Sequence, residues 1–314
     1  MTGSRILALG HYQPSQVVTN DDIAKIVDTN DEWIRDRVGI VSRRIAVDET
    51  VVDMATAAAG KALANCGLTA ADIDLVVVAT CTAIDRSPNV ACQVAARLGI
   101  VAPGAYDINT ACSGFGYALG TVDHAIRAGA ARNALVIGAE KLSDMIDWTD
   151  RSTCIIFADA AGAAVVTATA EGEPAGIGPV VWGSVPDKGD AVRIQGWRPY
   201  LKQEGQTVFR WATTALAPLA LQACERAGVA PSELAAFVPH QANARIIDGI
   251  AKRLGLTDAI VAKDIVESGN TSAASVPLAL SKIVERREVP SGAPVLLFGF
   301  GGGLTYAGQV IRCP

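Results

Sequence analysis

The 314-residue chain is poor in aromatic and charged residues and contains only three histidines. Charged residues make up 19% and the net charge is -5, so Lys and Arg are in deficit. Phosphate binding needs clustered basic side chains, which argues against nucleic acid as a partner. No apolar run approaches the ~20 residues of a membrane span, and the first ten residues lack the basic and apolar segments of a signal peptide. These absences predict a cytoplasmic protein that contacts neither membrane nor nucleic acid.

The cysteines form no recognisable framework. There are seven, scattered along the chain, with no C-x-x-C pair and no Cys/His cluster. An odd number without such spacing predicts reduced thiols, with neither disulfides nor a zinc site. We expect six of them to be small buried side chains, which leaves the question of whether one is a nucleophile.

Short, continuous apolar runs alternate with alanine-rich segments. Runs of this kind are typical of strands buried on both faces, and they occur at 75–79, 134–138, 154–157, 235–238 and 295–298. The segments between them have helical character and lie at 51–66, 89–98, 114–128, 209–227 and 242–254. This alternation predicts a layered α/β fold.

The two halves of the chain read as a distant internal repeat. In the first half a strand ending near Thr80 is followed by a second strand at 105–108, a polar turn, a helix and a third strand. The second half repeats this order with a strand ending at His240 and another at 261–266. The Gly/Pro-rich stretch 171–189 is the predicted connection. Because ligand sites in such sheets lie at strand ends, we expect one site shared by both halves.

Cys112 is the best candidate for a nucleophile. It follows a predicted strand and precedes Ser113, Gly114 and a helix. Free N–H groups and the positive end of the helix dipole lower a thiol pKa at such a position. The alternative is that Cys112 is a small core residue.

Two further polar positions end strand-like segments. His240 follows an apolar strand and can present an imidazole to a cavity; a surface histidine is the alternative. Asn270 could supply a fixed N–H donor or simply cap a helix. The glycine run 299–303 follows a buried strand and lacks the Lys-Ser/Thr of a Walker motif, so it suits an oxyanion hole better than a nucleotide.

Three segments together resemble the active-site motifs of β-ketoacyl-acyl carrier protein synthase III. They read TACSGF at 110–115, VPHQAN at 238–243 and GNTSAAS at 269–275. The segments 18–21, 31–34 and 150–157 and the glycine-rich end are similar too, so the resemblance covers nearly the whole chain. It implies a thiolase-like fold with duplicated α/β halves in a five-layer α-β-α-β-α arrangement. The halves would span 1–170, with the nucleophilic cysteine, and 171–314, with His and Asn.

The resemblance also implies a reaction and its residues. Cys112, His240 and Asn270 would form the catalytic triad, and the backbone N–H groups of Cys112 and Gly302 the oxyanion hole. An acyl-CoA would acylate Cys112, and malonyl-acyl carrier protein would lose carbon dioxide and condense with the acyl group. The product would be a 3-oxoacyl-acyl carrier protein that starts fatty acid or polyketide synthesis. No metal or other cofactor is implied, and the family is typically a homodimer.

Substrate contacts follow from the same resemblance. Trp33, Arg37, Arg151 and Asn243 would bind CoA, with Trp33 and Arg151 flanking the adenine. Gln241, Arg245, Lys252 and Arg253 would dock the acidic carrier protein. The alternatives are an ordinary core aromatic for Trp33, a surface ion pair for Arg151 and a solvated helix face for the basic residues.

Two rival functions remain open at this point. The chain could be a secondary-metabolism relative that transfers the acyl group to a hydroxyl, an amine or a CoA ester. It could also be a non-catalytic subunit that binds acyl-CoA or carrier protein. The intact Cys-His-Asn set speaks against the second rival, and the acceptor used after acylation of Cys112 tests the first.

Overall fold

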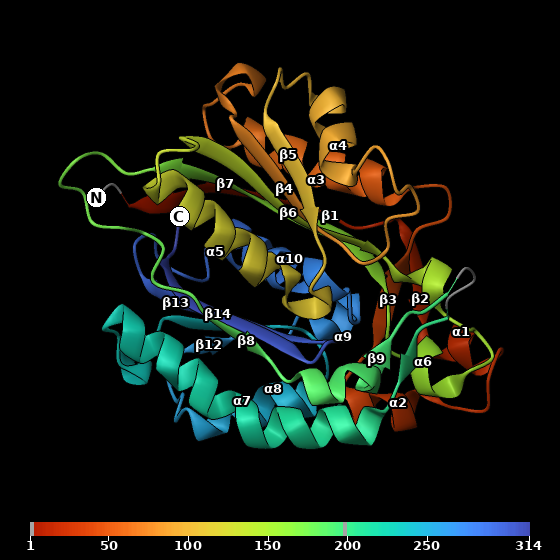
Figure 1. Cartoon of the computed structure of the whole chain (residues 1–314). Helices are drawn as coiled ribbons and strands as arrows, with labels where there is room; N and C mark the ends of the chain where they lie inside the picture. Colours follow the sequence, from red (N-terminus) through yellow and green to blue (C-terminus); the bar gives the residue numbers. More distant parts are fainter. Residues whose placement is uncertain (1–2, 197–199) are drawn as a thin grey trace.

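The computed structural model describes residues 3–196 and 200–314, which form two stacked five-stranded sheets (Figure 1). The first sheet has the order β1-β7-β6-β4-β5. Its strands are β1 (Ser4–Tyr12), β4 (Leu75–Ala79), β5 (Gly104–Ile108), β6 (Asn133–Lys141) and β7 (Asp159–Ala168). β4 runs parallel to both β5 and β6, while β7 is antiparallel to β6 and β1.

The second sheet repeats this pattern. Its order is β12-β11-β13-β14-β8. The strands are β8 (Val181–Ser184), β11 (Ala236–Pro239), β12 (Ile260–Val261), β13 (Pro294–Gly301) and β14 (Thr305–Arg312). β11 is parallel to β12 and β13, and β14 is antiparallel to its neighbours. The first sheet thus uses residues 4–168 and the second residues 181–312, and the predicted 170/171 boundary falls between them.

Helices complete five layers (Figure 1). α3 (Val51–Ala64) and α4 (Val90–Leu98) cover the outer face of the first sheet, and α7 (Gly205–Ala227) and α8 (Ala244–Arg253) that of the second. α5 (Gly114–Arg127) and α10 (Ser275–Glu285) lie between the sheets. This is the predicted α-β-α-β-α arrangement.

Small residues let these layers approach closely. The buried face of α3 includes Ala55, Ala58 and Ala62, all fully buried. A Cβ added to Gly10 in β1 would come within 2.3 Å of the Ala58 carbonyl oxygen, so only glycine fits there. The alanine-rich composition therefore reflects tight packing of helix on sheet.

Shorter elements gather beside the second sheet and its helices. They are β2 (Gln16–Thr19), α1 (Asn20–Ala24), α2 (Asp31–Val38), β3 (Ser42–Ile45), α6 (Arg151–Cys154), β9 (Val192–Arg193), β10 (Lys202–Gln203) and α9 (Ile265–Ser268). Within the described ranges, no helix combines the length and apolar character needed to cross a membrane.

Three predictions about elements are wrong. The run 154–157 is buried but not a strand, because Asp150 caps α6 by accepting the Ser152 N–H, and strand β7 starts only at Asp159. The segment 261–266 is not a strand, because β12 ends at Val261, residues 262–264 form a loop, and α9 begins at Ile265. The connection 171–189 contains the edge strand β8.

Candidate active site

A cavity of about 830 Å³ opens where the strand ends of both sheets meet. Cys112, His240, Asn270 and Gly302, which the sequence predicts to act together, all line it. Cys112 comes from the turn after β5, His240 follows β11, and Gly302 follows β13. The internal repeat is what brings these distant positions to one place.

The turn at Cys112 is tightly held. Ala111 has a φ of 45°, so the chain turns sharply before the short helix Ala111–Ser113 and α5. A Cβ on Gly301 of β13 would lie 2.8 Å from the Cys112 Sγ, so the thiol sits against bare backbone. The backbone N–H groups of Gly302 and of Cys112 itself lower the pKa of the thiol. Two backbone donors therefore act on the reacting atom.

The predicted lowering of the Cys112 pKa is wrong for the unliganded protein. Burial of the thiol raises its pKa to about 11, and the carboxylate of Glu140 raises it further. Hydrogen bonds from Ser272 and from the two N–H groups lower it but do not compensate. The resting group is a thiol, so its proton must leave before the sulfur attacks.

His240 is a buried, neutral imidazole. The residue is 1% exposed, and burial lowers its pKa to about 3. Its Nδ1 lies 2.7 Å from the Ser275 Oγ, which also accepts the Gln241 N–H at 3.3 Å. With Ser275 donating to Nδ1, the ring proton sits on Nε2. The ring also meets Phe300 edge-on, with centroids 5.2 Å apart.

Asn270 is held by its own backbone and by the next turn. Its N–H donates to the Ile156 carbonyl, and its carbonyl accepts the Ala158 N–H, both at 2.9 Å. Its Oδ1 accepts the Ser272 N–H at 2.9 Å. Because Oδ1 is used in this way, Nδ2 is left as a donor. Asn270 caps neither neighbouring helix, whose N-caps are Thr271 and Ala274.

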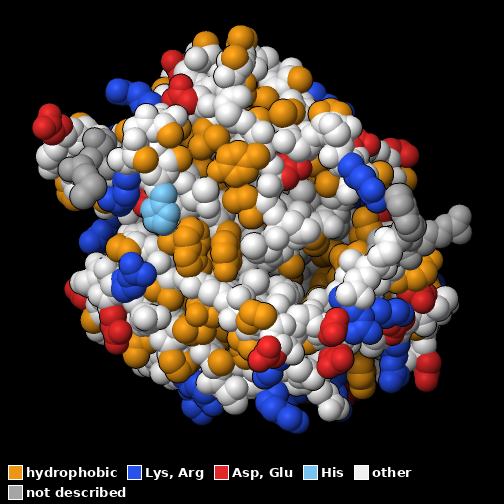
Figure 2. Space-filling view, viewed as in Figure 1, with side chains coloured by type: hydrophobic (Ala, Val, Ile, Leu, Met, Phe, Trp, Pro, Cys, Tyr) orange, Lys and Arg blue, Asp and Glu red, His pale blue; other side chains and the backbone are white. Residues whose placement is uncertain are grey.

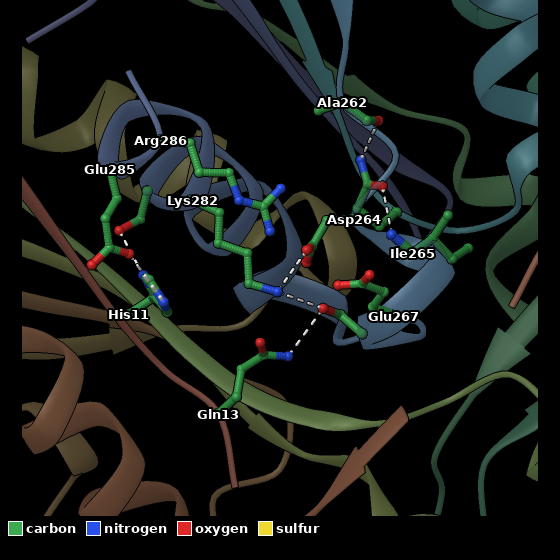
Figure 3. Close-up of polar contacts among 12 residues, drawn as sticks. His11, Gln13, Ala262, Asp264, Ile265, Glu267, Lys282, Glu285 and Arg286 are labelled. Carbon is green, nitrogen blue, oxygen red and sulfur yellow. Dashed lines mark hydrogen bonds and ion pairs between the residues drawn. The ribbon is translucent and has the colours of Figure 1, made fainter. Parts of the chain in front are cut away.

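A polar network around Ser268 holds the segment that precedes Asn270 (Figure 3). Lys282 of α10 pairs with Asp264 at 2.7 Å and donates to the Ser268 Oγ at 2.9 Å. Gln13 donates to the same oxygen at 3.0 Å. The network ties α9, α10 and the chain after β1 together, two residues before Asn270.

Three of the four residues predicted to bind CoA line the cavity, and the fourth, Arg151, does not line it but packs against Trp33. Trp33, Arg37 and Asn243 line it. The Arg151 guanidinium lies 5.0 Å from the centre of the Trp33 ring, and that of Arg37 lies 5.8 Å from it. Asn243 donates from Nδ2 to the Arg37 carbonyl at 2.9 Å and caps α8 by accepting the Arg245 N–H. This amide therefore links α2 to α8 at the wall of the cavity.

The docking prediction for Gln241 is wrong. The residue is 1% exposed. Its Nε2 donates to the Pro239 and Ala262 carbonyls and its Oε1 accepts the Ile265 N–H, so no polar atom is left for a docked protein. Arg245, Lys252 and Arg253 are exposed on α8. The Arg245 guanidinium rests over the Phe209 ring at 5.7 Å.

Sequence reasoning missed three polar side chains beside Cys112. Cys81 and Ser272 line the cavity, and Glu140 lies behind them, fully buried at the end of β6. One signal was present, since Glu140 is a charged residue that directly continues the apolar strand 134–138. The expectation of six buried thiols is also only half right, because Cys92 is exposed and Cys66 and Cys81 are part-buried. Among the described residues no group of His, Cys, Asp or Glu could hold a metal ion.

The family models that match the chain and its curated relatives carry the same description. Residues 106–186 match the family model 3-oxoacyl-[acyl-carrier-protein] synthase III, and residues 224–313 match its C-terminal model. The chain is 64% identical to beta-ketoacyl-[acyl-carrier-protein] synthase III 4 of Streptomyces coelicolor over 313 residues, 99% of each chain. It is also 64% identical over 315 residues to synthase III 2 of Streptomyces avermitilis, covering both chains fully.

Solved structures point to the same family as the sequence matches. The priming beta-ketosynthase of the R1128 polyketide biosynthetic pathway superposes with a TM-score of 0.97 at 42% identity, covering 99% of this chain and 96% of that one. The 3-oxoacyl-[acyl-carrier-protein] synthase III of Aquifex aeolicus gives a TM-score of 0.94 at 41% identity, covering 99% and 100%.

Proposed function

The chain belongs to the 3-oxoacyl-[acyl-carrier-protein] synthase III family, and we propose that Cys112, His240 and Asn270 perform its reaction. The enzyme is an acyltransferase that carries out the decarboxylative condensation initiating fatty acid or polyketide synthesis. We take an acyl-CoA as primer and malonyl-acyl carrier protein as extender. The observation that carries the residue assignment is the convergence of one thiol, one neutral imidazole, one amide and two backbone donors on a single cavity.

In the first half-reaction the Cys112 sulfur attacks the thioester carbonyl of the acyl-CoA. The oxyanion that forms would be held by the N–H groups of Cys112 and Gly302, the two backbone donors that lower the pKa of the thiol. Preorganised donors of this kind are worth about 3 kcal/mol of barrier each. CoA leaves with the thiol proton, and the acyl group stays on Cys112.

In the second half-reaction His240 and Asn270 act on the malonyl thioester. The Nε2–H of His240 and the Nδ2–H of Asn270 donate to the thioester oxygen as carbon dioxide leaves and enolate charge develops. A neutral imidazole suits this task, because it donates a hydrogen bond at every working pH. The carbanion then attacks the acyl-Cys112 carbonyl and releases the 3-oxoacyl product. The chemistry needs only these groups, so we propose no metal or redox cofactor.

The substrates would reach the cavity past α2 and α8. We propose that Trp33, Arg37, Arg151 and Asn243 hold CoA. An adenine that stacks on Trp33 must take the place of the Arg151 guanidinium or lie beneath it. Arg245, Lys252 and Arg253 supply positive charge beside this entrance, which suits an acidic carrier protein.

We propose that the enzyme is a cytoplasmic homodimer that pairs through β5. This strand is the edge of the first sheet. Nearby in the sequence, Ile84 is 72% exposed and Val101 83% exposed. Hydrophobic side chains gather on the face that carries α5 and β5 (Figure 2). Light scattering should give twice the 32.5 kDa chain mass, and a monomer at micromolar concentration would contradict the proposal.

Mass spectrometry of the intact protein tests the nucleophile. The enzyme is incubated with acyl-CoA thioesters of different length and branching, with Cys112→Ala as control. One acyl increment on the wild type and none on the variant is the expected result, and the preferred acyl group identifies the primer. No increment with any thioester would exclude the acyl-enzyme mechanism and favour a binding role.

A further inference from the structure

Arg43 of β3 is a charged side chain that solvent does not reach. It is 0% exposed, and burial lowers the pKa of its guanidinium only to about 10, so it is a cation at neutral pH. Among the described residues its acceptors are all neutral oxygens: the Asn20 Oδ1 at 2.8 Å, the Ile155 carbonyl at 2.7 Å and, more distantly, the Val18 carbonyl at 3.5 Å. Its Nε has no hydrogen-bond partner among them. A buried cation without a carboxylate is costly, and an apolar side chain often serves stability as well. Stability alone therefore does not account for this residue.

One acceptor of Arg43 leads directly to Asn270. The Ile155 carbonyl, which accepts from the Arg43 Nη2, begins the segment 155–158. The Ile156 carbonyl accepts the Asn270 N–H, and the Asn270 carbonyl accepts the Ala158 N–H, both at 2.9 Å. The segment 155–158 therefore fixes both backbone groups of Asn270, and Arg43 fixes the first carbonyl of that segment.

The backbone of β3 at Arg43 also lies close to the residue before Asn270. Gly269 has a φ of 67°, in the left-handed region that favours glycine. A Cβ added there would lie 3.1 Å from the Arg43 Cβ and 3.2 Å from the Ile156 carbonyl oxygen. The turn that leads into Asn270 thus fits between β3 and the segment 155–158, with no room for a side chain at Gly269.

The other close acceptor of Arg43 leads to the wall of the cavity. Asn20, the first residue of α1, donates from Nδ2 to the Asp31 Oδ1 and to the Ile40 carbonyl, both at 2.8 Å. These two residues lie at the beginning of α2 and just beyond its end. The planar fork of a guanidinium reaches acceptors in two directions at once, which the single nitrogen of a lysine does not. Arg43 therefore joins α2 to the segment 155–158.

We propose that Arg43 is a positioning residue for decarboxylation, which it supports by holding the Asn270 amide in place. This inference rests on the function proposed for Asn270. The guanidinium itself meets no substrate, because it is fully buried. It holds the segment 155–158, which in turn sets where the Nδ2–H of Asn270 lies. Cys112 is held separately, by its own turn against Gly301 of β13, so its acylation does not depend on Arg43.

The first variant is Arg43→Met, which keeps the length of the side chain and removes its charge and donors. Carbon dioxide release from malonyl-acyl carrier protein by the acyl-free enzyme should fall about 100-fold, the scale expected for a misplacement of about 1 Å. Single-turnover acylation of Cys112 at saturating acyl-CoA, followed by intact mass, should be unchanged. Arg44→Met is the matched control. Arg44 follows Arg43 on β3, points to the other face of the strand and donates to the Ser15 carbonyl at 3.0 Å. Both half-reactions should keep their wild-type rates in Arg44→Met.

A double variant separates positioning from general damage. Once Asn270→Ala has removed the amide, Arg43 has nothing left to position. Arg43→Met combined with Asn270→Ala should therefore decarboxylate at the rate of Asn270→Ala alone. Arg43→Lys keeps the charge but can reach only one of the two close acceptors, so it should lose about tenfold in decarboxylation, again without any further loss in the Asn270→Ala background. This conservative variant also provides the test if Arg43→Met does not fold.

Several results would overturn the proposal. One is wild-type decarboxylation in folded Arg43→Met or Arg43→Lys. Another is a loss from either variant that adds in full to that of Asn270→Ala. Equal losses in both half-reactions by a folded variant would show a general structural role instead. Wild-type decarboxylation in Asn270→Ala, or absence of any acyl-enzyme in the wild type, would contradict the proposed function itself.

Discussion

At the scale of single residues, burial holds both reacting side chains in their neutral forms. Desolvation raises the Cys112 pKa to about 11 and lowers the His240 pKa to about 3. A Cys–His ion pair, as in proteases that activate the thiol with a histidine, is therefore not the resting state here. In the proposed mechanism the two residues therefore serve separate half-reactions instead of one shared proton transfer.

This separation predicts an unusual pH profile for decarboxylation. A histidine with its ordinary pKa of 6.5 gains a proton below that pH, whereas His240 stays neutral down to about 3. The rate of malonyl-acyl carrier protein decarboxylation should therefore stay flat from pH 8 down to pH 5. Carbon dioxide release by acyl-free enzyme measures it, with protein folding checked at each pH. An inflection near pH 6.5 that tracks a single ionisation would contradict the assignment.

At the residue scale, the predicted triad lies together, since Cys112, His240 and Asn270 all line one cavity. Cys112 and His240 could be proposed because each follows a strand, whereas Asn270 follows α9 and was proposed from the resemblance of its segment. Gln241 was misplaced because adjacent residues in an irregular segment face different directions, and no periodicity shows which is buried. Glu140 was missed because its hydrogen-bond partners come from two distant segments, at 80–82 and 272.

At the scale of elements, glycine in β13 controls how closely the nucleophile turn approaches the second sheet. A Cβ at Gly301 would lie 2.6 Å from the Cys112 Cβ. Gly301→Ala should destabilise the fold by about 1–3 kcal/mol through overpacking, and it should slow acylation by displacing the thiol. Denaturant unfolding and single-turnover acylation measure the two effects.

Gly249 in α8 provides the matched control. A Cβ there meets nothing within 4 Å, so Gly249→Ala should stabilise the helix by roughly 0.5–1 kcal/mol. If Gly301→Ala were acylated at the wild-type rate, the turn that carries Cys112 would be free to shift, contrary to this account.

The ion pair between α10 and α9 is expected to be structural. Lys282 and Asp264 have side chains only 12% and 9% exposed; Lys282 pairs with the Asp264 Oδ1, and the Oδ2 of that carboxylate has no hydrogen-bond partner among the described residues. Lys282→Met leaves the Asp264 carboxylate buried and unpaired, which costs about 3 kcal/mol. Urea unfolding should show this loss, and adding Asp264→Leu should recover part of it. If Lys282→Met had the same free energy of unfolding as the wild type, the ion pair would be screened by water and the structural role assigned to it would be wrong.

The sequence predicted correctly the strands that are apolar and run in the parallel part of each sheet. β4, β6, β11 and β13 all fall on the apolar runs. β7 was not foreseen because its residues are mainly alanine and glycine, which have low strand propensity and are used here for close packing against α3 and α10. Such strands exist because of tertiary packing, which local sequence patterns do not record.

At the scale of the whole molecule, duplication explains why the site exists. The short helices Ala111–Ser113 and Ser272–Ala274 occupy equivalent places before α5 and α10, and both begin with a residue of positive φ. The first copy supplies the nucleophile Cys112. The second supplies Ser272 and the Asn270 segment. In the proposed mechanism, one half thus holds the acyl group and the other acts on the malonyl group.

The most direct test of this division is to assay the two half-reactions separately in the variants Cys112→Ala and Asn270→Ala. Cys112→Ala should take up no acyl group from acyl-CoA yet still release carbon dioxide from malonyl-acyl carrier protein. Asn270→Ala should be acylated normally but lose most of its decarboxylation, by 100-fold or more for a lost donor to the developing charge. If both variants lost both half-reactions to the same extent while remaining folded, the proposed division of labour would be wrong.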